Sequence, residues 1–116
     1  SLDPPLLLVC LSKKALSYEV FNKANYFGIN VLNKKQRAVS TLFSTQSDKK
    51  FLSDDWERGF KDIPILRGSL SKFVCAREKI IDAGDHTILI GRVVDLKFKT
   101  GDPLLYFKGG YVNNQE

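Results

Sequence analysis

The chain has 116 residues, of which 43% are hydrophobic and 27% are charged, and these proportions suit a soluble globular protein of one domain. Its net charge is +5 and its pI about 9.3, so its surface favours anionic partners such as phosphates, dinucleotides or nucleic acids. The longest apolar run, residues 6–11, is far too short to span a bilayer, so no membrane partner is expected.

Two strands and a short helix are predicted in the first third of the chain. The continuous apolar run over residues 5–12 predicts a strand that is buried on both faces. Ser17 can cap a helix over residues 18–25, whose apolar side chains share one face. These side chains are Val20, Phe21 and Ala24. Apolar residues alternate with others over residues 26–32, which predicts a second strand.

A second helix and a long loop are expected next. Asn33 followed by Gln36 matches a capping box in its asparagine form and predicts a helix over residues 34–44. That helix would bury Ala38, Val39, Leu42 and Phe43. Residues 45–62 are mostly polar and are predicted to form a loop with one helical turn near residues 48–52. The aromatic side chains expected to pin this loop to the protein are Phe51, Trp56 and Phe60.

The second half of the chain has the pattern of strands. They are predicted over residues 63–66, 68–82, 87–99 and 104–107, with turns at residues 82–85 and 100–103. Within the second of them the apolar positions shift from an even number, Leu70, to the odd numbers of Phe73 and Cys75. Such a shift predicts a bulge or a bend in that strand.

The end of the chain completes the predicted architecture. In the strand over residues 87–99, the side chains expected to face the interior are Val94, Leu96 and Phe98. Gly109 and Gly110 are expected to be flexible, and residues 113–116 to fray. Strands at this density, with helices confined to the first half, predict a mainly β fold: a small barrel with short flanking helices.

The cysteines and the histidine bear on compartment and metal binding. Cys10 and Cys75 both lie in apolar, strand-like segments, and they are expected to be reduced and buried rather than paired in a disulfide. Reduced cysteines point to the cytoplasm. A zinc site needs about four ligands. Two distant cysteines and the single His86 do not supply them, so no metal is expected.

Generic catalytic motifs do not occur in the sequence. It contains no P-loop, no G-x-G-x-x-G, no G-x-S-x-G and no H-E-x-x-H. The adjacent carboxylates of Asp54 and Asp55 lie in the polar loop, where they are expected to solvate it rather than to perform acid–base chemistry.

An ordered set of short segments is more informative than any single motif. The most specific is Gly84-Asp85-His86-Thr87 with Gly91 downstream. The set resembles the flavin reductases with an FMN-binding split β-barrel, above all the reductase components of two-component flavin monooxygenases. The segments follow the order found in that family and are residues 1–14, 26–32, 48–51, 64–70, 83–93 and 103–111.

This resemblance implies a fold and an activity. The fold would be a mainly β, split β-barrel with short flanking helices, in a single domain over residues 1–116. A homodimer would hold FMN or FAD in a groove at its interface. NADH or NADPH would pass hydride to the flavin, which would then leave for a partner monooxygenase. The flavin would do the redox chemistry and the protein would bind and orient it, which fits a sequence without a conventional catalytic motif.

Five residues are expected at the phosphate and nicotinamide end of the site. Ser12, Lys13 and Lys14 end the first strand with a hydroxyl, backbone N–H groups and ammonium charges, which suit the flavin phosphate. The resemblance implies that His86 lies beside the flavin ring and the nicotinamide, in a catalytic role. Asp85 is expected to orient the turn or His86.

Five further cofactor contacts are expected. The resemblance implies that the backbone of Ser1, Asp3 and Pro4 borders the isoalloxazine ring. Phe51 and Tyr111 could cover the cofactor or simply pack in the core.

The chain departs from the resembled family at its start. In the family a strand and a Thr/Ser-rich segment precede the landmark with which this chain begins, and that segment supplies donors to the flavin phosphate and ribityl chain. Its absence is expected to weaken flavin affinity and to leave an open barrel edge. A truncated gene product, a second chain with the missing part, and a piece of a longer chain all stay open.

Two other functions stay open beside flavin reduction. The first is a degenerate split barrel that binds flavin without turnover. The second is a basic β-barrel that binds nucleic acid, as proteins with exposed aromatics among basic residues do. The second is disfavoured because Phe73 and Phe98 are expected on apolar faces, and Lys97 and Lys99 then lack an exposed aromatic between them.

Overall fold

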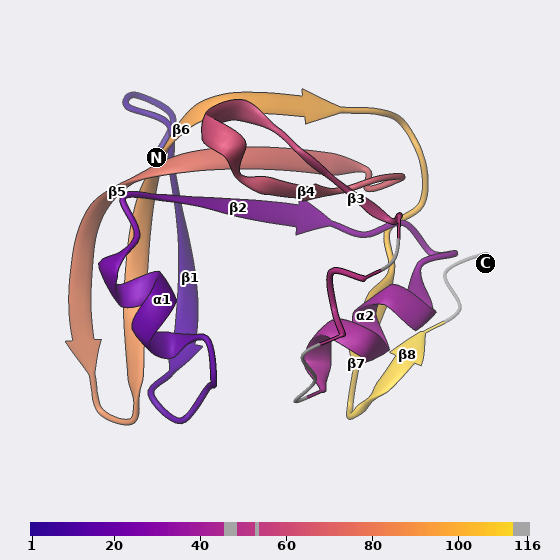
Figure 1. Ribbon diagram of the computed structural model, residues 1–116, viewed down its shortest axis with the longest axis horizontal. Helices are drawn as coiled ribbons and strands as arrows, with labels where there is room; N and C mark the ends of the chain where they lie inside the picture. Colours follow the sequence, from indigo (N-terminus) through magenta and orange to yellow (C-terminus); the bar gives the residue numbers. More distant parts are fainter. Residues whose placement is uncertain (46–48, 53, 113–116) are drawn as a thin grey trace.

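A curled four-stranded sheet forms the body of the protein, in the order β1–β6–β5–β2 with every neighbouring pair antiparallel (Figure 1). The computed structural model describes residues 1–45, 49–52 and 54–112. The strands of this sheet are β1 (Leu6–Ser12), β2 (Tyr26–Val31), β5 (Ser71–Ala83) and β6 (His86–Phe98).

Shorter elements flank the sheet. Two small antiparallel hairpins are β3 (Trp56–Arg58) with β4 (Pro64–Leu66), and β7 (Leu105–Phe107) with β8 (Gly110–Val112). The helices are α1 (Tyr18–Lys23), α2 (Arg37–Ser44) and the 3-10 turn η1 (Phe60–Asp62). Figure 1 shows α1 beside the end of β1, and α2 on the other side of the molecule with β7 and β8.

Two register irregularities shape the long strands β5 and β6. They fall between Val74 and Cys75 and between Arg77 and Lys79, and the first confirms the bulge predicted from the parity shift. Bulges bend a strand and increase its twist. The first half of β5 pairs with β2. The first half of β6 pairs with β1, at the end of the β5–β6 ladder that lies farther from β2.

The core lies where three strands meet. Phe27 on β2, Cys75 on β5 and Leu89 on β6 are buried together, and Leu7 and Val9 of β1 pack against them. Alternation along β1 and the first half of β6 therefore puts one set of side chains on the core and the other on the opposite face.

The prediction that the first strand is buried on both faces was wrong. Leu8 is 61% exposed, and Cys10 is exposed rather than buried. The reason is that β1 is an edge strand whose core face alone is covered by the described residues. Both cysteines are nevertheless free thiols, as expected.

The helices are shorter and less buried than predicted. Ser17 does occupy the N-cap of α1, but its side chain makes no capping hydrogen bond, and Val20 is 70% exposed. The Asn33 backbone N–H donates to Oε1 of Gln36 at 3.0 Å, as a capping box would. That bond closes a turn instead, so α2 begins only at Arg37 and contains no fully buried residue.

The loop predicted over residues 45–62 contains β3 and η1, because β3 pairs with β4. The predicted aromatic anchoring is confirmed for Phe51 and Trp56: the Phe51 ring lies 5.4 Å from that of Phe43 on α2 and 5.2 Å from that of Trp56. Phe60, the third expected anchor, is 44% exposed. The helical turn expected near residues 48–52 falls partly on Asp48, which lies outside the described residues.

Two predictions near the end of the chain were wrong. Leu96 is 46% and Phe98 79% exposed, because no described residue covers that face of β6. Gly109 is part of a tight hairpin turn rather than a flexible link. With Lys108 it makes a two-residue loop in which both φ angles are positive, 51° and 77°, as a type I′ turn requires. The fraying predicted for residues 113–116 lies outside the described residues.

Candidate functional site

The ladder between β1 and β6 ends at a pair of candidate residues. Ser12 is the register partner of His86, so their side chains share one face of the sheet. We call this the outer face; it carries Leu8, Cys10 and Ser12 of β1 and His86, Ile88 and Ile90 of β6. The intervening positions Thr87 and Leu89 are buried, at 2% and 1% exposure, and point to the core.

A two-residue hairpin loop presents the histidine. Ala83 pairs with His86, and the loop between them is Gly84–Asp85, with Gly84 at φ +67°. Glycine at the first central position is the preference of a type II′ hairpin turn. His86 therefore begins β6 directly at the tip, where its side chain is 47% exposed.

Asp85 holds the imidazole of His86. Its Oδ1 lies 2.8 Å from Nδ1, and because a carboxylate only accepts, the bond requires the tautomer or charge state with a proton on Nδ1. This leaves Nε2 as the ring nitrogen without that constraint. The hydrogen bond and the charge of His86 lower the pKa of Asp85 below its usual value. The prediction that Asp85 orients His86 agrees with this geometry.

The three residues at the end of β1 do not act alike. The Ser12 hydroxyl accepts a hydrogen bond from the Lys14 backbone N–H at 3.2 Å, and a hydroxyl that accepts can still donate its own proton. The Lys13 ammonium instead pairs with the Asp82 carboxylate on β5, and this hydrogen bond raises the pKa of Lys13 against the opposing effect of desolvation.

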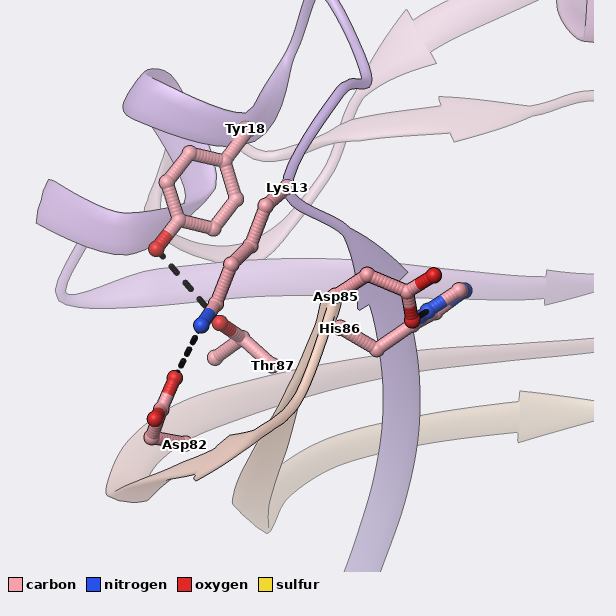
Figure 2. A network of polar contacts seen from close by, with 6 residues as sticks. All are labelled: Lys13, Tyr18, Asp82, Asp85, His86 and Thr87. Atoms are coloured by element: carbon pink, nitrogen blue, oxygen red, sulfur yellow. Dashed lines mark hydrogen bonds and ion pairs between the residues drawn. The ribbon is translucent and has the colours of Figure 1, made fainter.

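Figure 2 shows that the Lys13 and His86 side chains point away from each other. Lys13 lies with Asp82, Tyr18 and Thr87, and the Thr87 hydroxyl donates to the Tyr18 hydroxyl at 3.4 Å. Asp82 and Thr87 are register partners, so this group belongs to the core-facing side of the ladder. The sequence did not show that Tyr18, Asp82 and Thr87 lie together, because these residues belong to a helix and two different strands and share no common spacing.

The predicted ring contacts lie at the far end of β1. The Ser1 hydroxyl donates to the Pro4 carbonyl at 2.7 Å, and the Leu6 N–H donates to the Ser1 carbonyl at 3.0 Å, so this segment folds on itself. Asp3 lies in the same turn. Seven residues of β1 at about 3.3 Å each separate it from His86 by roughly 20 Å. One chain therefore does not bring the two groups of candidates together.

The last two candidates lie on the side of α2. Phe51 is 47% exposed and lines a largely apolar cavity of about 700 Å³ between α1, β2, α2 and β4. The Tyr111 hydroxyl lies 2.8 Å from that of Ser40, and the Arg37 guanidinium is 4.9 Å from its ring centre. Hydrogen bonds from Ser40 and Thr41 lower the pKa of Tyr111. Neither residue meets the hairpin tip of the same chain.

The described part of the chain has neither a cluster of metal ligands nor a helix that could cross a membrane. Among residues 1–45, 49–52 and 54–112, no three His, Cys, Asp or Glu side chains gather as ligands for a metal ion. Within the same ranges, each helix is too short or too polar to cross a membrane.

Comparison with known proteins adds a family and relatives. The model of the flavin reductase like domain matches residues 1–115. A "Probable flavin reductase" of Rhizobium meliloti (strain 1021) is 43% identical over 111 residues, which are 96% of this chain and 36% of that protein. Reductase subunit HsaB of a flavin-dependent monooxygenase from Rhodococcus jostii (strain RHA1) is 36% identical over 112 residues, 96% of this chain and 57% of that protein.

A solved structure supports the fold. It is the NADH:FAD oxidoreductase SgcE6 of Streptomyces globisporus C-1027, in complex with NAD and FAD fragments, with a TM-score of 0.92 and 28% identity. The match covers 97% of this chain and 70% of that chain, and it confirms the mainly β, split β-barrel fold class. The chain spans only 36% and 57% of the lengths of the two curated relatives.

Proposed function

This chain belongs to the flavin reductase like domain family, and on that premise we propose that it serves the reduction of FMN or FAD by NADH or NADPH. SgcE6, an NADH:FAD oxidoreductase solved with NAD and FAD fragments, supports these ligand classes. The name of HsaB, a reductase subunit of a flavin-dependent monooxygenase, supports delivery of the reduced flavin to a partner monooxygenase. The flavin, when bound, supplies the redox chemistry, and the residues of this chain bind and orient it.

One observation carries the proposal: the imidazole of His86, held by Asp85, lies beside the end of β1, where a hydroxyl and an ammonium group could bind a phosphate. His86 and Ser12 are paired on the outer face, and Lys14 follows two residues later. A hydroxyl and an ammonium group suit a phosphate, and an imidazole fixed through Nδ1 by Asp85 directs Nε2 to a ligand on that face. The residues present at this end therefore fit a flavin or nicotinamide nucleotide.

The roles assigned to individual residues follow from this arrangement. Ser12 and Lys14 bind the flavin phosphate, and His86 contacts the nicotinamide or the flavin ring. Asp85 keeps the imidazole in one tautomer. Ser1, Asp3 and Pro4 border the isoalloxazine ring, and because they lie at the far end of β1, we propose that they serve a flavin shared with a second chain.

The outer face supports the homodimer that this sharing needs. On β1 it exposes Leu8 and Cys10, and Ile88 and Ile90 of β6 are only half-buried beside them. Covering such side chains with a second copy removes apolar surface from water and stabilises the pair. We therefore place the flavin groove of a homodimer along this face. We further propose a single domain over residues 1–116, and the two free thiols agree with a cytoplasmic location.

The test is a fluorescence titration of the purified chain with FMN, followed by NADH oxidation with and without added flavin. Saturable quenching at micromolar FMN and flavin-dependent NADH oxidation support the proposal. His86→Ala should then lower kcat/KM for NADH at least tenfold. His86→Gln places an amide near the Nε2 position, which faces the ligand, and should retain more activity than the alanine variant. Equal activity of the wild type and His86→Ala would remove His86 from the site.

Two other results would favour the competing functions. Quenching by FMN without NADH oxidation would mean a flavin-binding barrel without turnover. A nucleic-acid function regains one argument from the structure, because Phe98 is largely exposed between the exposed residues Lys97 and Lys99. Aromatic side chains among basic ones are the pattern of single-strand binding. Fluorescence anisotropy of a labelled single-stranded oligonucleotide tests this second candidate, which requires saturable binding abolished by Phe98→Ala.

A further inference from the structure

Lys13 holds the tip of the β5–β6 hairpin in two ways. Its backbone N–H donates to the Asp85 carbonyl at 2.9 Å, which extends the β1–β6 ladder into the hairpin loop. Its ammonium group reaches past the end of β6 and pairs with Asp82 on β5. Because β6 lies between β1 and β5, this one side chain connects the two outer strands of the trio across the end of the middle one.

The ammonium group lies on the wrong side of the ladder for a ligand beside His86. It shares the core-facing side with Tyr18, Asp82 and Thr87, while His86 points to the outer face (Figure 2). Only 34% of the Lys13 side chain is exposed, whereas 81% of its partner's is. The charged groups around the ammonium are Asp82 and Asp85, with the Tyr18 hydroxyl nearby.

We infer that Lys13 and Asp82 are positioning residues that clasp the hairpin tip to β1 and thereby fix the Asp85–His86 pair, rather than ligands of the flavin phosphate. This inference rests on the proposed function for the role of His86, and it removes Lys13 from the phosphate contacts expected from the sequence.

The clasp acts through a short chain of contacts. The side-chain pair of Lys13 and Asp82 holds the end of β5 beside β1. The Lys13 backbone N–H then stays within reach of the Asp85 carbonyl, and the Asp85 carboxylate holds the His86 ring, with 2.8 Å between Oδ1 and Nδ1. The loop itself offers little other support, since it has two residues and, apart from the chain neighbours of Gly84, no described residue lies within 4 Å of where its Cβ would be. The Asp85 side chain is 88% exposed, so packing does not hold it either. Loss of the clasp should therefore change the orientation of His86 before it changes the fold.

The experiment compares Lys13→Met, Asp82→Asn, the double variant, and the swapped pair Lys13→Asp with Asp82→Lys. Lys35→Met serves as a control that removes the same charge from an exposed lysine before α2. Three quantities are measured: kcat and KM for NADH, the Kd for FMN, and the NMR chemical shifts of the imidazole ring. The chain contains one histidine, so the ring signals belong to His86 without further assignment.

The clasp predicts similar effects of the two single variants. Each should lower kcat/KM for NADH about two- to fivefold, the factor that corresponds to an exposed ion pair. The double variant should be no worse than either single one, because both remove the same contact. All three should shift the ring signals of His86 and keep the Kd for FMN within twofold. The swapped pair should recover part of the loss, and Lys35→Met should match the wild type.

Two results would overturn the inference. One is a Kd for FMN that rises with Lys13→Met and not with Asp82→Asn, since the ammonium would then bind the ligand. The other is unchanged ring signals in both single variants. If the wild type oxidises no NADH with added flavin, the proposed function fails, but the ring signals still decide whether the clasp exists.

Discussion

Gly91 is a position where one added methyl group would collide with two buried side chains of the core. A Cβ built there would lie 2.6 Å from the Cβ of Cys75 and 2.6 Å from Cζ of Phe27. Both neighbours are core residues, at 0% and 4% exposure, so neither can move without disturbing its own packing. Glycine is thus required in β6 because two strands approach closely, not because of its backbone angles.

The magnitude follows from two opposing effects of Gly91→Ala. Alanine is favoured over glycine in a strand by about 0.5–1 kcal/mol. Overpacking a dense core costs about 1–3 kcal/mol. The net loss in the free energy of unfolding should therefore be about 1–2 kcal/mol, and with a urea m value of about 1–3 kcal/mol per molar the midpoint should fall by about 1 M.

Urea unfolding followed by the fluorescence of Trp56, the single tryptophan, measures this change. Gly110→Ala is the matched control, because no described residue beyond its chain neighbours lies within 4 Å of its Cβ position and its φ angle is not positive. Its midpoint should stay near that of the wild type. Phe27→Leu removes the ring edge that meets the new methyl group, so the double variant should lose less than the sum of the single losses. An unchanged or raised midpoint for Gly91→Ala would refute the reasoning.

Three further predictions concern charge, thiols and association. His86→Ala should raise the pKa of Asp85 in a carboxyl NMR titration, because the hydrogen bond from His86 is the main cause of its lowering. The stability that this carboxylate contributes is present above pH 3.8 and is lost as the pH falls through its lower folded-state pKa. In His86→Ala, the free energy of unfolding should therefore depend less on pH in this acid range. Cys75 is buried, and burial raises the pKa of its thiol, so it should react with a thiol reagent only in denaturant. Cys10 is exposed and should react in the folded chain. Its reaction should be slower at protein concentrations where two copies associate through the outer face. Leu8→Asp on the outer face should shift sedimentation towards the monomer; an unchanged profile would place the dimer elsewhere.

Periodicity predicted the strands and the bulge because these depend on local alternation. It failed where burial depends on strand order. The run over residues 6–11 is apolar throughout, but β1 is an edge strand, so half of that surface is exposed in the chain described here. The prediction that Phe98 faces the interior failed for a related reason. Alternation shows which residues share a face of the strand, but it does not show which of the two faces is covered.

The site was predictable in its parts and not in its assembly. The Gly84-Asp85-His86 motif indicated the hairpin turn, and Asp85 and His86 are hydrogen-bonded there, while the role of Asp85 in orienting the histidine stays a prediction. The partner of Lys13 was not visible, because Asp82 is 69 residues away in the sequence and meets it only through the three-strand ladder. Sequence spacing also could not show that Ser1 lies near the start of β1 while His86 lies beside its end. The resemblance assigned both residues to one site without giving the distance between them.

The two-residue loop at Gly84–Asp85 makes the length of this hairpin as important as its composition. Side chains alternate with a period of two, so one inserted or deleted residue between β5 and β6 would slip the register by one. His86 would then turn to the core side of the sheet, and the buried side chains of Thr87 and Leu89 would turn to the outer face. Descendants of this gene can therefore vary many positions in β6, but they must conserve the number of residues in the turn before it.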